Sequence, residues 1–172
     1  NILKKMNANI KIIKLKEKMG EPIGNIYVKS SFLKPINCPR KLVPSAIDEF
    51  PLLFVVASMI KGTTKFSGIE ELRHKESDRI KTMEFGLNQL GIKTKSAHSS
   101  LKIFGNPKIR NNKKINIFAK KDHRVAMSFF CLGQILNIKI HIFNFETVNT
   151  SFSKFLYTMK KIGANFEIKK KN

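Results

Sequence analysis

The chain contains one structural pattern twice, and this repetition limits the folds that it can adopt. The stretches that begin at Asp48 and at Asp122 both open with an acidic residue and continue as a nearly all-apolar segment. An apolar segment of this length, with Asp at the N-cap position, predicts a buried helix. Each segment then enters a β-branched stretch, 63–66 or 138–143, which predicts a strand.

An amphipathic helix and a further strand are expected after each of these strands. The apolar stripes that predict the two helices are Ile80, Met83, Leu87 and Leu90 in the first copy, and Phe152, Phe155 (or Leu156), Met159 and Ile162 in the second. Each stripe ends at a glycine suited to a left-handed C-cap, Gly91 or Gly163. Strands are expected at 92–95 and 165–168. The Asp-to-Gly distance is 43 residues in one copy and 41 in the other. The alternative to an internal repeat is that two segments of similar length arose by chance.

The N-terminal segment 3–12 resembles segment 159–168 and is interpreted as the end of a preceding unit, with Asn7 in the left-handed position. The expected organisation is therefore a remnant of one unit at 1–40, one unit at 41–105 and a last unit at 106–172. Repeated helix–strand–helix–strand units predict an α/β fold with the all-apolar helices inside and the amphipathic helices outside.

The net charge of +21 raises the possibility of a nucleic-acid partner, but the composition argues against it. The 33 basic residues include only five Arg, and the Lys residues are scattered, without a basic motif interleaved with aromatic residues. Because Lys, Ile, Asn and Phe share AT-rich codons, coding bias accounts for the excess. We therefore expect no nucleic acid partner, although the charge can attract anionic small molecules.

Neither the cysteines nor the apolar segments indicate secretion or a membrane. Cys38 and Cys131 have no metal-ligand spacing, which favours a reduced, cytoplasmic compartment. The longest apolar run, 52–60, is too short for a bilayer, which needs roughly 20 residues. No metal-ligand cluster, glycine-rich phosphate loop or Ser-His-Asp pattern is present. We expect no metal, no cofactor and no membrane association.

The segment from His74 to Arg79 concentrates acids and bases just before a helical pattern. If helical, Lys75 and Arg79 place two positive charges on one face near a helix N-terminus, where the helix dipole already disfavours cations. A bound anion would turn that cost into affinity. Glu76 lies beside the pair, and Asp78 is expected to cap the helix. The alternative is an ordinary solvated charged helix start.

The second acid–base segment, Asp122-His123-Arg124, opens the other apolar helix. A buried Arg124 needs a counter-ion, which could be Asp122, another carboxylate or a substrate. His123 could carry protons or simply donate a hydrogen bond. Asp48 is the cap equivalent of Asp122; a cap role explains it, and accepting a substrate hydroxyl proton is the second possibility. Thr150 and Ser151 are interpreted as N-cap residues of the last helix.

The combination of these motifs resembles a known family. Asp48-Glu49-Phe50-Pro51, Gly62-Thr63-Thr64, the stretch from Glu70 to Arg79, Asp122-His123-Arg124 and Asn149-Thr150-Ser151-Phe152 are similar in order and spacing to the C-terminal domain of the 5-enolpyruvylshikimate-3-phosphate synthase family. The resemblance implies repeated βαβαββ units in an inside-out α/β domain. It also implies transfer of the enolpyruvyl group of phosphoenolpyruvate to the 5-hydroxyl of shikimate 3-phosphate, in aromatic amino-acid biosynthesis.

The same resemblance implies a role for each site residue. Asp48 would bind the shikimate hydroxyls and accept a proton, and Glu76 would exchange a proton with the methylene carbon of phosphoenolpyruvate. Lys75 would contact shikimate 3-phosphate, Arg79 and Arg124 would contact phosphoenolpyruvate, and His123 would neighbour the site. The partners that the resemblance implies are both substrates and an absent N-terminal domain, without which this chain is expected to be inactive. The complete protein is expected to be a monomer.

The chain departs from some members of the family at Glu71, where they have Asn, and at Thr150, where they have Lys. Neither position is therefore assigned a substrate contact. Two alternatives stay open on the sequence: another enolpyruvyl transferase, of the UDP-N-acetylglucosamine type, and a basic nucleic-acid-binding module.

Overall fold

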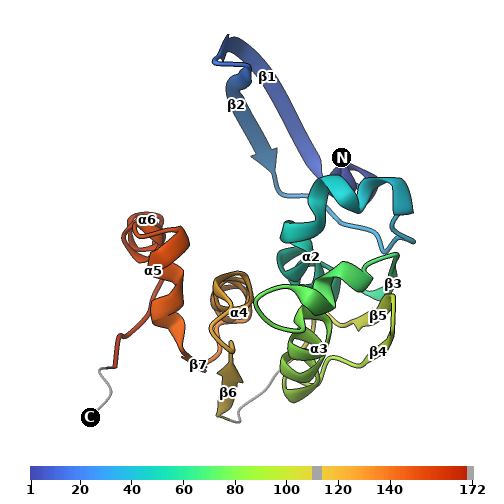
Figure 1. The fold of residues 1–172 in the computed structure, drawn as a ribbon, viewed down its shortest axis with the longest axis vertical. Helices are drawn as coiled ribbons and strands as arrows, with labels where there is room; N and C mark the ends of the chain where they lie inside the picture. The colour runs from blue at the N-terminus through green and yellow to red at the C-terminus, as the bar shows by residue number, and fades with distance from the viewer. Residues whose placement is uncertain (110–113, 170–172) are drawn as a thin grey trace.

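The computed structural model describes residues 1–109 and 114–169 and has a mixed α/β architecture, so the predicted fold class is confirmed (Figure 1). The helices are α1 (Ile2–Lys5), η1 (Arg40–Leu42), η2 (Pro44–Glu49), α2 (Phe50–Ser58), η3 (Glu70–His74), α3 (Arg79–Gln89), α4 (His123–Leu136), η4 (Phe145–Thr147), α5 (Val148–Ser151) and α6 (Phe155–Lys161), where η denotes a 3-10 helix. The strands are β1 (Asn9–Lys18), β2 (Glu21–Lys29), β3 (Gly62–Ser67), β4 (Thr94–Ala97), β5 (Ser100–Gly105), β6 (Ile115–Phe118) and β7 (Ile140–Phe143).

The central part of the chain contains β2, α2, β3, α3, β4 and β5 in that order, with 3-10 helices between some of them. β5 lies between β3 and β4 and is antiparallel to both. Asn37 forms a parallel bridge with Lys65 of β3, which adds a short extended segment ahead of α2. The strand predicted at 92–95 begins two residues later, at Thr94, because Gly91 ends α3 in the expected left-handed conformation with φ +86°.

The buried helices pack where the apolar pattern places them. Phe50 and Phe54 of α2 and Phe66 of β3 are completely buried and form three edge-to-face ring contacts, with centroids 5.0–5.9 Å apart. The predicted stripe of α3 is buried along its whole length. Gly86 of α3 lies against the ring of Phe129 in α4, and a Cβ at this position would come within 2.2 Å of the ring. Only glycine therefore permits this approach of α3 to α4.

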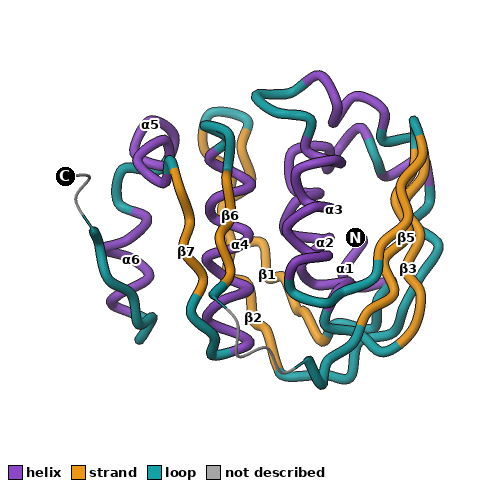
Figure 2. Tube along the Cα trace, turned by 90° about the horizontal axis from the view of Figure 1, so that it is seen from below, coloured by secondary structure: helices purple, strands orange, loops and turns teal. Residues whose placement is uncertain are grey.

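The last part of the chain pairs β6 with β7 in parallel, with α4 as the connection (Figure 2). Asn137 ends α4 in the left-handed conformation, φ +51°. The ring of Phe130 in α4 contacts those of Phe145, Phe155 and Phe166, with centroids 5.2–5.8 Å apart. Aromatic contacts therefore attach the C-terminal helices to α4.

Three sequence predictions about the last part are wrong. Residues 165–168 form no strand; the backbone of Asn165 instead exchanges two hydrogen bonds of 2.9 Å with the side chain of Gln134. The last helix starts only at Phe155, so Phe152 and Ile162 fall outside it and are exposed. Thr150 and Ser151 belong to α5 rather than capping α6. The hydroxyl of Thr150 donates to the Thr147 carbonyl, which shows that it serves the preceding turn.

The N-terminal segment is a short helix followed by a strand, and its interpretation as the end of a preceding unit stays a prediction. Asn7 is left-handed, φ +70°, and follows α1, whose Ile2 is buried together with Met6. β1 and β2 then form a long antiparallel ribbon that extends away from the body (Figure 1). The proposed unit boundaries at residues 40/41 and 105/106 stay predictions.

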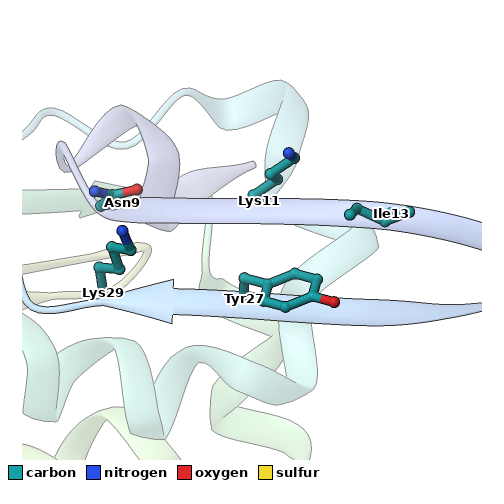
Figure 3. Close-up of a pocket in the computed structure, with 5 residues that line it drawn as sticks. All are labelled: Asn9, Lys11, Ile13, Tyr27 and Lys29. Atoms are coloured by element: carbon teal, nitrogen blue, oxygen red, sulfur yellow. The ribbon is translucent and has the colours of Figure 1, made fainter.

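The ribbon is exposed on both faces. One face carries two directly opposite apolar pairs, Ile10 with Val28 and Ile12 with Ile26. The other face carries a shallow hollow lined by Asn9, Lys11, Ile13, Tyr27 and Lys29 (Figure 3). The hollow includes none of the predicted site residues and is open to solvent. A two-stranded ribbon with such faces is marginally stable alone in water.

None of the helices in residues 1–109 and 114–169 is both long and apolar enough to cross a bilayer.

We predict that the apolar face of the ribbon makes this chain associate, because Ile12, Ile26 and Val28 are all more than half exposed. Sedimentation velocity at increasing concentration should show a rising average mass. The double variant Ile26→Lys/Val28→Lys should shift the chain towards monomer. Asn25→Lys/Tyr27→Lys adds the same charges to the other face of β2 and should leave association unchanged. A parent chain that is monomeric at every concentration would contradict the prediction.

Candidate active site

The candidate site is organised around Arg79, the first residue of α3. Its side chain is 1% exposed, and its three guanidinium nitrogens each donate to a different carboxylate. Nε lies 2.9 Å from Asp122 Oδ2, Nη1 lies 2.9 Å from Asp48 Oδ1, and Nη2 pairs with Glu76 Oε2. A buried Arg is stable only when its charge is compensated, and here three separate segments of the chain supply the compensation.

The pKa of Arg79 reflects this arrangement. Burial lowers the pKa of the guanidinium, but the hydrogen bond and charge of Asp122, the hydrogen bond from Asp48 and the charge of Glu76 outweigh burial and leave the pKa above its ordinary value. Arg79 is therefore always charged, and it is a permanent donor to both predicted catalytic carboxylates.

Asp48 does not cap α2, which corrects one of the two roles considered for it. The 3-10 helix η2 continues directly into α2, so the N-cap residue is Glu49, and neither residue makes a side-chain cap bond. The Asp48 carboxylate instead faces Arg79 and, at 3.7 Å, the Nζ of Lys75. Its side chain is 46% exposed, so it is accessible for a proton-accepting role.

The pKa of Asp48 lies below its ordinary value. Partial burial raises the pKa, but the hydrogen bond from Arg79 and the positive charges of Arg124, Lys75 and Arg79 have the larger combined effect. Asp48 is consequently ionised near neutral pH.

Lys75 and Arg79 do not share a helix face, because the chain between them is not helical. The backbone is extended at Lys75, between η3 and α3. The two cations still converge, since both reach Asp48 Oδ1. Lys75 also pairs with Glu71 at 2.6 Å, and this hydrogen bond is the main reason that the Lys75 pKa is raised.

The two predicted caps at the other helix starts are confirmed. Asp78 Oδ1 accepts from the backbone N–H of Lys81, and its Oδ2 accepts from Arg73. Asp122 Oδ1 accepts from the backbone N–H groups of Arg124 and Val125, at 3.0 and 3.3 Å.

The first turn of α4 brings His123 and Arg124 to the site. His123 Nδ1 lies 3.8 Å from Glu76 Oε1. Arg124 Nη1 donates to the carbonyl of Asp48 and to the carboxylate of Glu49, at 2.9 and 2.8 Å. Glu49 is thus the counter-ion that the sequence required for Arg124. The carboxylate of Asp122, another of the three possibilities considered, is bound to Arg79 instead.

The structure therefore places all six predicted site residues in one network: Asp48, Lys75, Glu76, Arg79, His123 and Arg124. Sequence reasoning missed the parts played by Ser77, whose hydroxyl donates to Asp122, and by Glu49 and Glu71, which pair with predicted substrate-binding cations. For Glu49 and Glu71 the only signal was their position beside the motifs. The substrate contacts of the predicted residues, that of Arg79 included, stay predictions.

The arrangement suits acid–base chemistry on an anion. Two half-exposed carboxylates, Asp48 and Glu76, are held by one guanidinium, with a lysine, a histidine and a second arginine at their edges. Within residues 1–109 and 114–169, no group of three or more His, Cys, Asp or Glu is arranged to hold a metal ion. Arg79 joins Asp48, Glu76 and Asp122, and Lys75 joins Asp48 and Glu71.

We predict that Arg79→Met destabilises the fold strongly and in a pH-dependent way. At pH 7 the loss should be about 3–5 kcal/mol, because the buried Asp122 loses its counter-charge. In the parent chain the lowered pKa of Asp48 makes stability fall as pH falls through the carboxyl range. In the variant Asp48 loses its hydrogen bond from Arg79, so its pKa should return towards the ordinary value and stability should fall less as pH falls.

Urea unfolding at pH 7 and pH 5 tests this, and the gap between parent and variant should narrow at the lower pH. Arg73→Met is the matched control, because Arg73 also makes three hydrogen bonds and pairs with an Asp, but near the surface. Its effect should be smaller and similar at both pH values. A gap for Arg79→Met that stays constant would argue against charge compensation as the role of Arg79.

Comparison with known proteins matches residues 1–159 to the family EPSP synthase (3-phosphoshikimate 1-carboxyvinyltransferase). A 3-phosphoshikimate 1-carboxyvinyltransferase of Clostridium tetani is 42% identical over 160 residues, and one of Zymomonas mobilis is 39% identical over 170. These matches cover 93% and 97% of this chain but 36% and 38% of the relatives, so the chain spans little more than a third of their length.

The fold agrees with the sequence matches. An EPSP synthase structure from Acinetobacter baumannii superimposes with a TM-score of 0.88 at 39% identity and covers 98% of this chain and 39% of its own. A second EPSP synthase structure from the same organism gives a TM-score of 0.86 at 37% identity. These matches favour neither the UDP-N-acetylglucosamine type of transferase nor a nucleic-acid-binding module.

Proposed function

The chain belongs to the EPSP synthase (3-phosphoshikimate 1-carboxyvinyltransferase) family, and on that premise we propose that it forms one side of an enolpyruvyl transferase active site. The reaction proposed is transfer of the enolpyruvyl group of phosphoenolpyruvate to the 5-hydroxyl of shikimate 3-phosphate, with release of phosphate. The observation that carries the proposal is the pair of half-exposed carboxylates, Asp48 and Glu76, held by the buried Arg79.

The chemistry needs a base at oxygen and an acid at carbon, and the two carboxylates can fill these roles. Asp48 accepts the proton of the 5-hydroxyl while the hydroxyl oxygen forms a bond to the central carbon of phosphoenolpyruvate. Glu76 gives a proton to the methylene carbon, which becomes a methyl group. Loss of phosphate, with return of a methyl proton to Glu76, then restores the double bond. The proton held by Asp48 passes to the departing phosphate, so both carboxylates end as they began. The lowered pKa of Asp48 keeps it ready to accept a proton near neutral pH.

The cations around the carboxylates suit the charges of the substrates. Lys75 is proposed to contact the phosphate of shikimate 3-phosphate, and Arg79 and Arg124 to contact phosphoenolpyruvate. These three cations share the network with five carboxylates: Asp48, Glu49, Glu71, Glu76 and Asp122. The described site therefore has a local excess of negative charge. Two anionic substrates require further positive groups. We assign these groups to a segment corresponding to the part of the relatives that this chain does not span, about two-thirds of their length.

The proposed setting follows from the family. The chain would act within a cytoplasmic biosynthetic enzyme, with the rest of the longer polypeptide as its partner. The two cysteines in the described structure, Cys38 and Cys131, are unpaired, which accords with a reducing compartment.

The decisive experiment is a chimaera in which this chain replaces the matching segment of the Clostridium tetani relative. With phosphoenolpyruvate and shikimate 3-phosphate it should release phosphate. Glu76→Gln should reduce kcat by about 10²- to 10⁴-fold, the usual contribution of a general acid–base group. UDP-N-acetylglucosamine offered as acceptor should give no release. A chimaera that is folded by circular dichroism but releases no phosphate would contradict the proposal.

We further predict that Glu49→Gln strengthens phosphoenolpyruvate binding in the same chimaera. Glu49 is exposed and pairs with Arg124 at 2.8 Å, so the substrate must compete with it. An exposed ion pair is worth about 0.2–1 kcal/mol, so KM for phosphoenolpyruvate should fall up to about fivefold, with kcat less affected. Glu17→Gln removes an exposed ion pair on the distant ribbon and should change neither constant. A raised KM would mean that Glu49 orients Arg124 for binding instead of competing with the substrate.

A further inference from the structure

Asp122 is a completely buried carboxylate whose two oxygens serve different parts of the molecule. Oδ1 accepts from the first backbone N–H groups of α4, those of Arg124 and Val125. Oδ2 accepts from the hydroxyl of Ser77 at 3.0 Å and from Nε of Arg79 at 2.9 Å. One side chain thus ties the start of α4 to the start of α3.

The hydrogen bond at Nε determines where the rest of Arg79 points. A guanidinium is planar, and its donors keep a fixed angular relation to one another. Once Nε is bound to Asp122, the directions of Nη1 and Nη2 are set. These two nitrogens hold Asp48 and Glu76, so the two proposed acid–base groups take their positions from a contact that neither of them makes.

A capping role alone does not account for Asp122. A helix start needs only one acceptor oxygen, and Ser or Asn supplies it as well as Asp does. Burying an ionised carboxylate costs several kcal/mol unless its charge is paired. The second oxygen, with Arg79 on one side and Ser77 on the other, is what requires a carboxylate here.

We propose that Asp122 and Ser77 are positioning residues of the transferase site, which fix the orientation of Arg79 and through it the placement of Asp48 and Glu76. The inference rests on the proposed function for the meaning of that placement. Neither Asp122 nor Ser77 faces the half-exposed side of the site, since both side chains are buried. They act through Arg79, and substrate need not touch either residue.

The contacts of Asp48 make the role measurable. Asp48 is faced by Arg79, Arg124 and Lys75, and Glu76 is faced by Arg79 and His123. If Arg79 turns away, Asp48 loses its hydrogen bond but keeps the charges of Arg124 and Lys75. The pKa of Asp48 should then rise towards its ordinary value.

The test compares four variants in the chimaera. Asp122→Asn keeps the size and the capping oxygen but removes the charged acceptor for Arg79, and should lower kcat about 10- to 100-fold, as expected for losing a hydrogen bond between charged groups. Ser77→Ala should lower kcat less, by about tenfold at most. Ser77→Thr keeps the hydroxyl and should restore kcat to near the parent value. Asp78→Asn alters the Asp that caps α3 and pairs with Arg73, and should leave kcat unchanged.

The pH profile separates positioning from mere stability. Asp122→Asn should move the acidic limb of kcat/KM to higher pH, because the substrates titrate identically in every variant and only the enzyme groups differ. A variant that merely folds less well would show the parent's acidic limb once the rate at each pH is divided by the fraction folded at that pH, measured by circular dichroism. The proposal would be overturned if Asp122→Asn left both the acidic limb of kcat/KM and kcat per folded site unchanged. It would also be overturned if Asp122→Asn and Asp78→Asn lowered kcat equally.

A second measurement does not depend on transferase activity. Carboxyl carbon-13 NMR titration of Asp48 in the 172-residue chain should give a higher pKa in Asp122→Asn than in the parent. An identical pKa in both would also overturn the proposal. If the parent chimaera releases no phosphate while the Asp48 pKa still rises in the variant, the proposed function fails and the positioning of Asp48 through Arg79 stands.

Discussion

The guanidinium of Arg79 is the interaction on which the site depends. It is buried at the start of α3, and it can be there only because carboxylates from η2, from the segment before α3 and from the start of α4 all reach it. Each of those segments is placed by ordinary apolar packing around α2, α3 and α4. The electrostatic requirement of one side chain then brings their ends together. The acid–base pair, the cations at its edges and the second arginine are all arranged around this requirement.

Much of the fold was predictable because it follows from local patterns. Apolar runs gave α2 and α4, the stripe ending at Gly91 gave α3, and Asp78 and Asp122 were identified as caps. These features depend on neighbours a few residues away. The predicted strand at 165–168 depended on a pairing partner, and in the described structure the Gln134 side chain takes that place. Strand pairing over long sequence distances leaves no local signal.

The sequence predicted which residues form the site better than it predicted which of them contact one another. All six residues predicted from the acid–base motifs and the family resemblance lie in one network. Yet a helix-capping role had been considered for Asp48, and a helix face shared with Arg79 had been considered for Lys75. The structure contradicts both possibilities, because the 3-10 helix η2 and the extended backbone at Lys75 replace regular helix there. Which carboxylate pairs with which arginine was not visible either, since Asp122 and Arg79 are far apart in sequence. Long-range electrostatic partners are chosen by the assembled fold.

The close contact of Gly86 with Phe129 has a mechanical consequence for the site. Gly86 lies seven residues after Arg79, and Phe129 lies seven residues after Asp122. The two helices are therefore fastened at two points about 10 Å apart along each axis, once by charge and once by ring packing. Two contacts at separate points along α3 and α4 oppose both sliding and rotation of one helix relative to the other. The segments that carry Glu76, His123 and Arg124 are thus held at fixed positions relative to one another, and Asp48 is tied to the same helix starts by its contacts with Arg79 and Arg124.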